Sequence, residues 1–165
     1  MSPLKLPESP AAFAAAGWDD VAAYYDQLAA APLDSHTLDG WLGDWSTLEE
    51  LLTEAASVAM IAYTVDTADP AKERAHLRFS TEIMPRADER SVALARRLVE
   101  SGLERADLAT VLARFRTQIG LFRESNVPLF SELEKLGSRY QRITGSMTAM
   151  WDGEERPIPQ LQPFL

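Results

Sequence analysis

The sequence contains no cysteine among its 165 residues. This absence excludes disulfide bonds, cysteine nucleophiles and cysteine-ligated zinc, so the fold depends on packing alone. Histidine is also scarce: His36 and His76 are the only two, and no His-Glu-x-x-His is present. Forty residues separate them, so one helical turn cannot carry both as metal ligands. We therefore predict no catalytic residue, no cofactor-binding residue and no metal ligand in this chain.

The chain also lacks long apolar runs and an excess of positive charge. No stretch approaches the ~20 apolar residues of a membrane span. Pro3, Pro7, Glu8 and Pro10 interrupt the beginning of the chain, which leaves no apolar segment of the kind found in signal peptides. Sixteen basic and 25 acidic residues give a formal net charge of -9, which repels nucleic acid and anionic lipid headgroups. We expect a cytoplasmic protein with neither of these as a partner.

The composition that remains, 46% hydrophobic and 25% charged, is typical of one globular domain. Apolar spacing predicts an all-α fold: a bundle of about four long antiparallel helices plus a short N-terminal helix, with a small hairpin or extended tail near the C-terminus. We divide this single domain, residues 1–165, into three parts. An extended lead covers 1–17, the helical bundle covers 18–146, and 147–165 hold a turn and the start of a truncated helix.

Two helices are predicted in the first part of the bundle. The short one begins near Trp18 and ends at Ala31, before a proline. The long one is predicted by an apolar stripe whose steps alternate between three and four residues. The stripe comprises Leu38, Trp41, Trp45, Leu48, Leu52, Ala55, Ala59 and Ala62. A capping box at Ser46 to Glu49 leaves a later start of this helix open.

Asp69-Pro70 predicts the start of the next helix, because Asp69 can cap the first turn and Pro70 loses no hydrogen bond there. This helix is expected to end near Ser101 and to kink near Pro85. Its predicted core residues are Phe79, Ile83, Ala87, Leu94 and Leu98.

Two further amphipathic helices complete the predicted bundle, which would bury their apolar faces between the helices. The first carries Leu108, Val111, Leu112, Phe115, Ile119 and Phe122. The second is capped by Asn126 and carries Leu129, Leu133, Leu136, Tyr140, Ile143 and Met147. Asp152-Gly153 then predicts a tight turn, with Pro157 and Pro159 confining the second arm to an edge. The apolar end of the chain, Ile158, Leu161 and Leu165, suggests a fragment of a longer protein.

Several sets of residues are candidates for sites of chemistry. Glu73-x-x-His76 matches half of a di-iron motif, but Leu33 occupies the position that a second copy would need. The arginines Arg86, Arg90, Arg96, Arg97 and Arg105 can receive a carboxylate-rich partner, but Asp88, Glu89 and Glu100 between them favour surface pairing. Glu49, Glu50 and Glu54 are interpreted as a solvated face, with an acid and base pair left open. Trp41 and Trp45 are interpreted as core rather than as a stacking platform.

A series of short motifs, in order and spacing, resembles the N-terminal region of oligoendopeptidase F-type zinc metallopeptidases, of the thimet oligopeptidase-like superfamily. The resemblance spans roughly residues 18–165. The motifs are Trp41-x-x-Asp44-Trp45-x-x-Leu48, Tyr63, Asp66-Thr67-x-Asp69, Phe115-Arg116, Arg123-Glu124-x-Asn126-Val127-Pro128-Leu129, Tyr140, Gly145-x-Met147 and Asp152-Gly153-Glu154-Glu155.

This resemblance implies a non-catalytic N-terminal domain that precedes a zinc-binding catalytic domain in the same polypeptide. The two parts would enclose a channel, and this chain would be the wall that limits substrates to short peptides. The zinc ligands and the catalytic glutamate would lie downstream, so none is assigned here and the chain alone is expected to be inactive. The alternative is a free-standing helical protein-interaction module without enzyme activity, which would bury its apolar tail at Ile158, Leu161 and Phe164.

Overall fold

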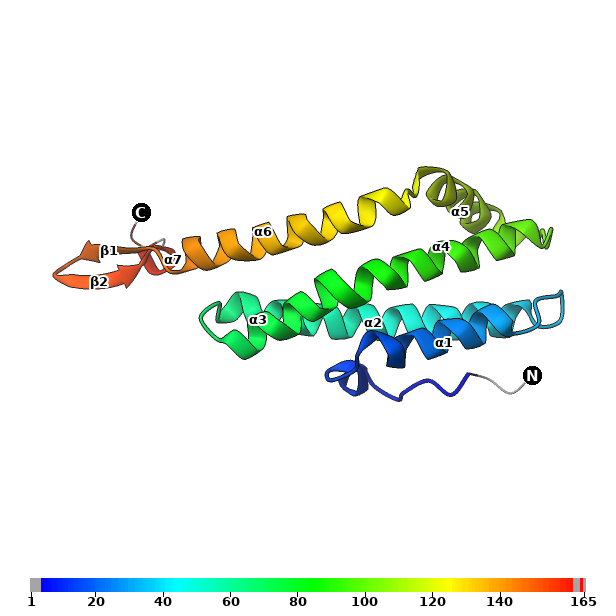
Figure 1. The fold of residues 1–165 in the computed structure, drawn as a ribbon, viewed down its shortest axis with the longest axis horizontal. Coiled ribbons are helices and arrows are strands. Elements are labelled where there is room, and N and C mark those ends of the chain that lie inside the picture. Colours follow the sequence, from blue (N-terminus) through cyan, green and yellow to red (C-terminus); the bar gives the residue numbers. More distant parts are fainter. Residues whose placement is uncertain (1–3, 162–163, 165) are drawn as a thin grey trace.

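The computed structural model describes residues 4–161 and 164 and shows an all-α fold with one small hairpin (Figure 1). The predicted fold class is confirmed. Helices of the first half are η1 (Pro10–Phe13), α1 (Trp18–Ala30), α2 (Leu38–Val65), α3 (Pro70–Leu77), the π-helical η2 (Arg78–Ile83) and α4 (Met84–Glu100). The second half comprises η3 (Ala106–Leu108), α5 (Ala109–Leu121), η4 (Glu124–Asn126), α6 (Val127–Gly145), β1 (Thr148–Trp151), β2 (Glu154–Pro157) and α7 (Ile158–Leu161).

The core lies among α1, α2 and α4. Helix α2 begins at Leu38. Of the two starting points that the sequence left open for this helix, the earlier one is therefore observed. The apolar stripe of α2 is buried from Leu38 to Ala55, and both tryptophans belong to the core, as predicted. The Trp41 indole N–H donates to the carbonyl of Leu28 at 2.9 Å, which satisfies its polar atom at the end of α1. A 3-10 helix, η1, interrupts the predicted extended lead.

The junction between α2 and α3 has the predicted cap. An Asp69 carboxylate oxygen accepts from the backbone N–H of Ala71 at 2.7 Å and of Lys72 at 3.4 Å, and Pro70 is in the first turn. The helix that follows is not a uniform α-helix, because the π-helical η2 separates α3 from α4. All five predicted core residues of this segment are buried: Phe79, Ile83, Ala87, Leu94 and Leu98.

The break falls in the turn before Pro85, where a kink was predicted. Proline has no N–H to donate to the carbonyl four residues earlier, which belongs to Thr81. The Ser131 hydroxyl of α6 donates to this carbonyl at 3.3 Å. A long-range hydrogen bond thus replaces the helical one, and it fixes α6 beside η2.

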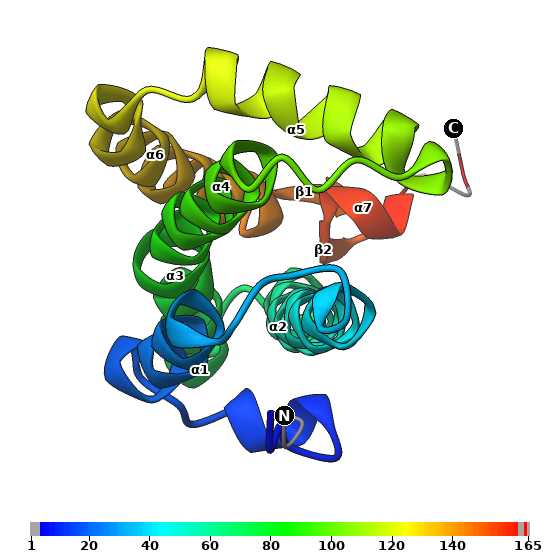
Figure 2. The same cartoon turned by 90° about the vertical axis from the view of Figure 1, so that its right-hand side faces the viewer.

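Helices α5 and α6 differ from the predicted bundle. Helix α5 runs crosswise to α4 (Figure 2), and within the described part of the chain Leu112 is its one buried residue. The expected burial of the apolar face of α6 is wrong: Leu129, Leu133, Leu136, Tyr140 and Ile143 are all exposed, and so is Met147, which lies two residues beyond the end of the helix that was predicted to carry it. The predicted side-chain cap by Asn126 is also absent from the described structure, since this residue ends η4 without such a bond.

Helix α6 contacts the bundle through small and polar residues instead. Ser131, Ser138 and Gly145 recur every seven residues, so they share one side of the helix. Ser138 is buried beneath Tyr63 of α2, and a Cβ on Gly145 would lie 2.9 Å from the Thr67 hydroxyl. Close approach on this side is possible because these residues have short side chains or none. The apolar face therefore points away from α2.

The predicted turn at Asp152-Gly153 forms. Its two residues have φ of 55° and 79°, which suits a two-residue turn between paired strands, and β1 and β2 pair antiparallel with Trp151 opposite Glu154. Pro157 ends β2 opposite Thr148. Among the described residues, no helix combines the length and apolar character needed to cross a membrane.

Candidate functional site

A groove of about 1490 Å³ lies between α2, η2, α4, α5 and α6. Helix α5 passes over α4 (Figure 2), and residues of both α5 and α2 belong to the lining of the groove. The apolar residues Phe79, Met84, Val92, Phe115 and Phe130 contribute to its lining. Sites for small molecules typically occupy ~300–1,000 Å³. The groove is thus large enough for an extended segment of polypeptide.

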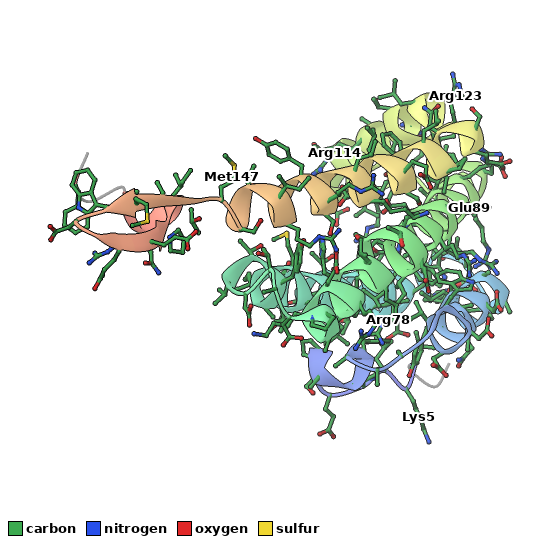
Figure 3. All side chains as sticks on the ribbon, turned by 60° about the vertical axis from the view of Figure 1, so that its left-hand side comes forward. Lys5, Arg78, Glu89, Arg114, Arg123 and Met147 are labelled. Atoms are coloured by element: carbon green, nitrogen blue, oxygen red, sulfur yellow. The ribbon has the colours of Figure 1, made fainter. Side chains whose placement is uncertain are left out.

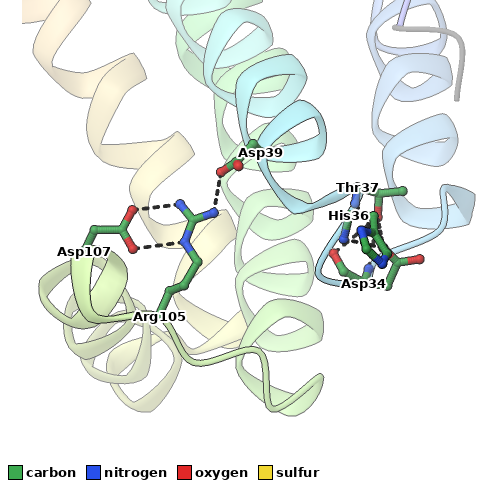
Figure 4. Close-up of polar contacts among 6 residues, drawn as sticks. All are labelled: Asp34, His36, Thr37, Asp39, Arg105 and Asp107. Atoms are coloured by element: carbon green, nitrogen blue, oxygen red, sulfur yellow. Dashed lines mark hydrogen bonds and ion pairs between the residues drawn. The ribbon is translucent and has the colours of Figure 1, made fainter.

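The position of α5 over the groove depends on the loop that follows α4. Gly102 has a φ of 69°, a conformation that favours glycine, and it turns the chain out of α4. Arg105 then binds two carboxylates (Figure 4): Nη1 lies 2.7 Å from Asp39, at the start of α2, and Nη2 lies 2.7 Å from Asp107. The same guanidinium lowers the pKa of Asp107. Arg105 therefore links the start of α5 to the start of α2.

An aromatic stack connects α5 to the core. The rings of Trp45 on α2 and Phe115 on α5 are stacked, with centroids 5.2 Å apart and planes inclined by 25°. Trp45 is buried and Phe115 lines the groove. The tryptophan thus supports the groove from behind and is not exposed as a platform for a ligand.

Beneath the groove, Glu49 receives three hydrogen bonds. Its Oε1 accepts from the Tyr25 hydroxyl at 2.9 Å, from the Trp45 indole N–H at 3.0 Å and from the Ser91 hydroxyl. The assignment of Glu49 to a solvated face is therefore wrong: this half-buried carboxylate joins α1, α2 and α4. The predicted solvation holds for Glu50 and Glu54, which are exposed.

Asp88 places a second carboxyl group near Glu49, on the lining of the groove. Burial raises the pKa of Asp88, and the negative charge of Glu49 raises it further. The Glu49 oxygen is already occupied by its three donors, whereas Asp88 faces the groove. Asp88 is thus the carboxyl group of the pair that is placed to meet an N–H or a cation in a bound chain.

Basic groups occupy the opposite side of the groove. Arg114 on α5 and Arg123 after α5 belong to its lining, and both side chains are labelled in Figure 3. Arg123 Nη1 donates to the carbonyls of Gly120 and Phe122 at 2.8 Å and 2.7 Å, which fixes its side chain at the end of α5. The Ser80 hydroxyl oxygen, also on the lining, is buried and has no hydrogen-bond partner among the described residues. The groove therefore has polar groups of both signs on an apolar surface.

The two histidines do not form a site with each other or with carboxylates. His36 lies in the loop before α2, where its backbone N–H donates to Asp34 at 2.8 Å (Figure 4). His76 stacks on Tyr63 with centroids 5.2 Å apart, and Glu73 pairs with Arg142 at 3.4 Å. Across the described chain, no three His, Cys, Asp or Glu residues come together as metal ligands. The residues present do not fit a zinc ion.

The arginine run has structural partners, although most are not the acids next to it in sequence. Arg90 pairs with Asp26 of α1 at 3.1 Å, and Arg86 lies over the Trp18 ring at 5.8 Å. Arg97 donates to the carbonyls of Leu28 and Ala31, the first at 2.9 Å, and so caps the C-terminal end of α1. Pairing with the intervening Asp88, Glu89 and Glu100 was predicted, but among the described residues no ion pair joins these acids to the arginines. Arg90 and Arg97 instead bind α4 to α1.

Sequence reasoning missed the groove and the outward apolar surface of the second half. Met147 lies between the end of α6 and the hairpin (Figure 3). Exposed apolar residues continue there with Met150, Trp151, Ile158 and Phe164. One signal was available: Ser131, Ser138 and Gly145 form a second stripe on α6, opposite the apolar one.

Comparison with known proteins identifies one family. The model of the family described as the Peptidase M3 N-terminal domain matches residues 10–109, well over half of the chain. The match covers η1 to α4 and the first residue of α5. No curated protein and no solved structure gives a match.

Proposed function

The chain belongs to the peptidase M3 N-terminal domain family, and on this premise we propose that it is the non-catalytic N-terminal domain of a zinc-dependent oligopeptidase of the oligoendopeptidase F type. It forms one wall of the peptide channel of a cytoplasmic enzyme and limits substrates to short peptides. The family match carries this proposal, and the size and lining of the groove support the proposed role in binding peptide.

The groove is suited to an extended peptide for three reasons. Its volume of about 1490 Å³ exceeds that of a typical small-molecule site. Its lining combines apolar side chains with Asp88 and Arg114, which can meet the N–H groups, carbonyls and charged termini of a short peptide. It lies between helices, so a folded protein domain would not fit into it.

The hydrolytic chemistry is assigned to a catalytic domain outside this chain. In zinc peptidases the metal supplies an activated water that attacks the peptide carbonyl. The histidines and carboxylates of this chain do not fit such a metal, so the chain contributes binding and exclusion of large substrates. Its partners are the catalytic domain of the same polypeptide and short peptides.

A peptidase assay tests this proposal. We expect the 165-residue chain with added zinc to cleave no short peptide, because no residue set is placed to hold the metal. Zinc-dependent turnover by the purified chain, inhibited by a chelator, would overturn the proposal. A positive arm uses a separately purified catalytic domain of an oligoendopeptidase F-type peptidase, to which the chain is expected to bind.

One observation favours a second candidate, the free-standing interaction module. Trp151, Ile158 and Phe164 near the C-terminus are exposed, and exposed apolar patches often mark protein interfaces. Light scattering distinguishes the two proposals. A stable dimer that is lost on substitution of Trp151 would favour the module, whereas a monomer that binds the catalytic domain would favour the peptidase domain.

A further inference from the structure

We propose that the outward face of α6 is a docking seam for one amphipathic α-helix of the catalytic domain. This inference rests on the proposed function and names the surface through which the two domains join. We call the surface the α6 seam; it consists of Leu129, Leu133, Leu136, Tyr140, Ile143 and Met147. Their side chains are between 49% and 68% exposed. They are therefore available to a partner in the isolated chain.

The spacing of the α6 seam specifies a helix as the partner. Its steps are four, three, four, three and four residues, which is the pattern by which two helices interlock their side chains. From Leu129 to Ile143, the last of these residues within α6, the α6 seam extends about 21 Å at 1.5 Å per residue, and Met147 lies two residues beyond the end of the helix. A partner helix needs about 14 residues and an apolar stripe of the same spacing to cover the helical part.

Hydrogen bonds hold the opposite side of α6 against the bundle, and they keep the α6 seam exposed. Ser131 donates to the Thr81 carbonyl at 3.3 Å, and Ser138 donates to the Tyr63 hydroxyl at 3.1 Å. At 3.6 residues per turn, these serines lie about 180° from the α6 seam. Turning the seam inward would break both bonds and would set large side chains where Gly145 now approaches Thr67.

The edges of the α6 seam indicate the charge of the partner. Glu132 and Arg139 lie along one edge; Glu132 pairs with Lys135 at 2.7 Å, whereas Arg139 has no ion pair among the described residues. A carboxylate on the partner helix would complement Arg139. Gly137 lies on the other edge, with nothing within 4 Å of the position of a Cβ, so the partner can approach closely there.

Charge also argues against a second copy of this chain as the occupant. An antiparallel copy that covered the whole α6 seam would form three kinds of residue pair, each occurring twice: Leu129 with Met147, Leu133 with Ile143, and Leu136 with Tyr140. This arrangement sets Arg139 beside Arg139 of the copy, and like charges across a helix pair are unfavourable. A different helix, with a carboxylate at this level, avoids the repulsion.

The position of the seam connects docking to the groove. Phe130 lies on the same edge of the α6 seam as Gly137 and also lines the groove. A helix docked on the seam therefore runs along the rim of the groove. Docking would close this side of the groove and give the peptide channel its second wall.

Titration calorimetry tests the α6 seam, with the purified catalytic domain of an oligoendopeptidase F-type peptidase as the probe. Leu136→Glu is expected to weaken binding about thirtyfold or more, because a charge replaces a central apolar contact. Arg139→Glu is expected to weaken binding at least about threefold. Because the new charge repels a carboxylate on the partner, added salt should weaken the binding of this variant less than it weakens the binding of the unchanged chain. The matched control Gln141→Glu adds a negative charge to an exposed site on α6 outside the seam, and it should leave the Kd unchanged.

Each outcome has a separate meaning. Equal affinity of Leu136→Glu and the unchanged chain would overturn the α6 seam while leaving the proposed function intact. Failure of the unchanged chain to bind the catalytic domain would overturn the proposed function and the inference together. A dimer of the chain in sedimentation, abolished by Leu136→Glu, would assign the seam to a second copy and would also overturn the inference. Circular dichroism confirms that the variants, all at exposed positions, remain folded.

Discussion

The hydroxyl of Tyr63 on α2 donates a 2.9 Å hydrogen bond to the backbone carbonyl of Ser138 on α6, and the Ser138 hydroxyl donates to the same tyrosine oxygen at 3.1 Å. Tyr63 is 0% exposed and Ser138 is 4% exposed. Two buried polar groups thus satisfy each other across 75 residues of sequence. This contact determines which side of α6 faces the bundle, and so which side is left outside.

Removing the tyrosine hydroxyl should loosen α6. Tyr63→Phe leaves the buried Ser138 hydroxyl without this acceptor and is expected to lower the free energy of unfolding by about 1–2 kcal/mol. Urea denaturation measures the loss, and amide hydrogen exchange in α6 should accelerate more than in α2. Tyr140→Phe is the control, since Tyr140 is exposed, and it should have little effect. Equal effects of the two substitutions would contradict this account of α6.

The carboxylate beneath the groove should be required for stability. Glu49→Leu removes the acceptor of the Tyr25, Trp45 and Ser91 donors, and we expect a loss of about 2 kcal/mol or more in urea denaturation. Glu50→Leu, at the neighbouring exposed position, should stay within about 0.5 kcal/mol of the unchanged chain. Trp45 fluorescence should shift only in the first variant. A neutral Glu49→Leu would show that Glu49 does not organise the three helices.

Asp88 should have the opposite effect on stability. Its pKa is raised in the folded state, first by burial and then by Glu49, so its ionised form is less favourable in the folded than in the unfolded chain. Asp88→Asn is therefore expected to stabilise the chain at pH 7. The gain should shrink as the pH falls below the raised pKa, where the aspartic acid is protonated in the folded state as well.

Thermal unfolding between pH 4 and pH 7 measures the Asp88 effect. Glu89→Gln removes the same charge from the neighbouring residue, which does not line this groove, and serves as the control for net charge. If Asp88→Asn and Glu89→Gln gave the same change at every pH, the position of Asp88 in the groove beside Glu49 would not be the cause.

Two glycines of α6 should respond differently to alanine. Gly137 has nothing within 4 Å of the position of a Cβ, so Gly137→Ala is expected to stabilise by about 0.5–1 kcal/mol through helix propensity. Gly145→Ala would place its Cβ 2.9 Å from the Thr67 hydroxyl and should destabilise instead. Denaturation midpoints of the two variants test this difference. Thr67→Ala should relieve the cost of Gly145→Ala; a stabilising single Gly145→Ala would contradict the close contact.

Much of the fold could be predicted because its signals are local. Asp69 and Pro70 start a helix through bonds within its first turn, and Asp152-Gly153 form a turn through their own backbone conformations. The stripe of α2 was long enough to place the helix from Leu38 onward despite its two early glycines. The family resemblance, which depends on the order of short motifs, agreed with the match to the peptidase M3 N-terminal domain.

The candidate site could not be predicted in the same way. The groove exists because α5 crosses α4, and this crossing depends on the loop containing Gly102 and Arg105 and on the stack of Phe115 on Trp45. Glu49 looked like a surface residue because its donors come from α1 and α4, far away in sequence.

The sequence by itself determined where the main helices and the hairpin form, since caps, turns and apolar periodicity act over a few residues. It also determined that α6 has an apolar face that favours burial. Only the tertiary structure decided where that face points. Contacts of Ser138 with Tyr63 and of Gly145 with Thr67 need the short side chains of the other face, so close packing and buried hydrogen bonds leave the apolar face exposed.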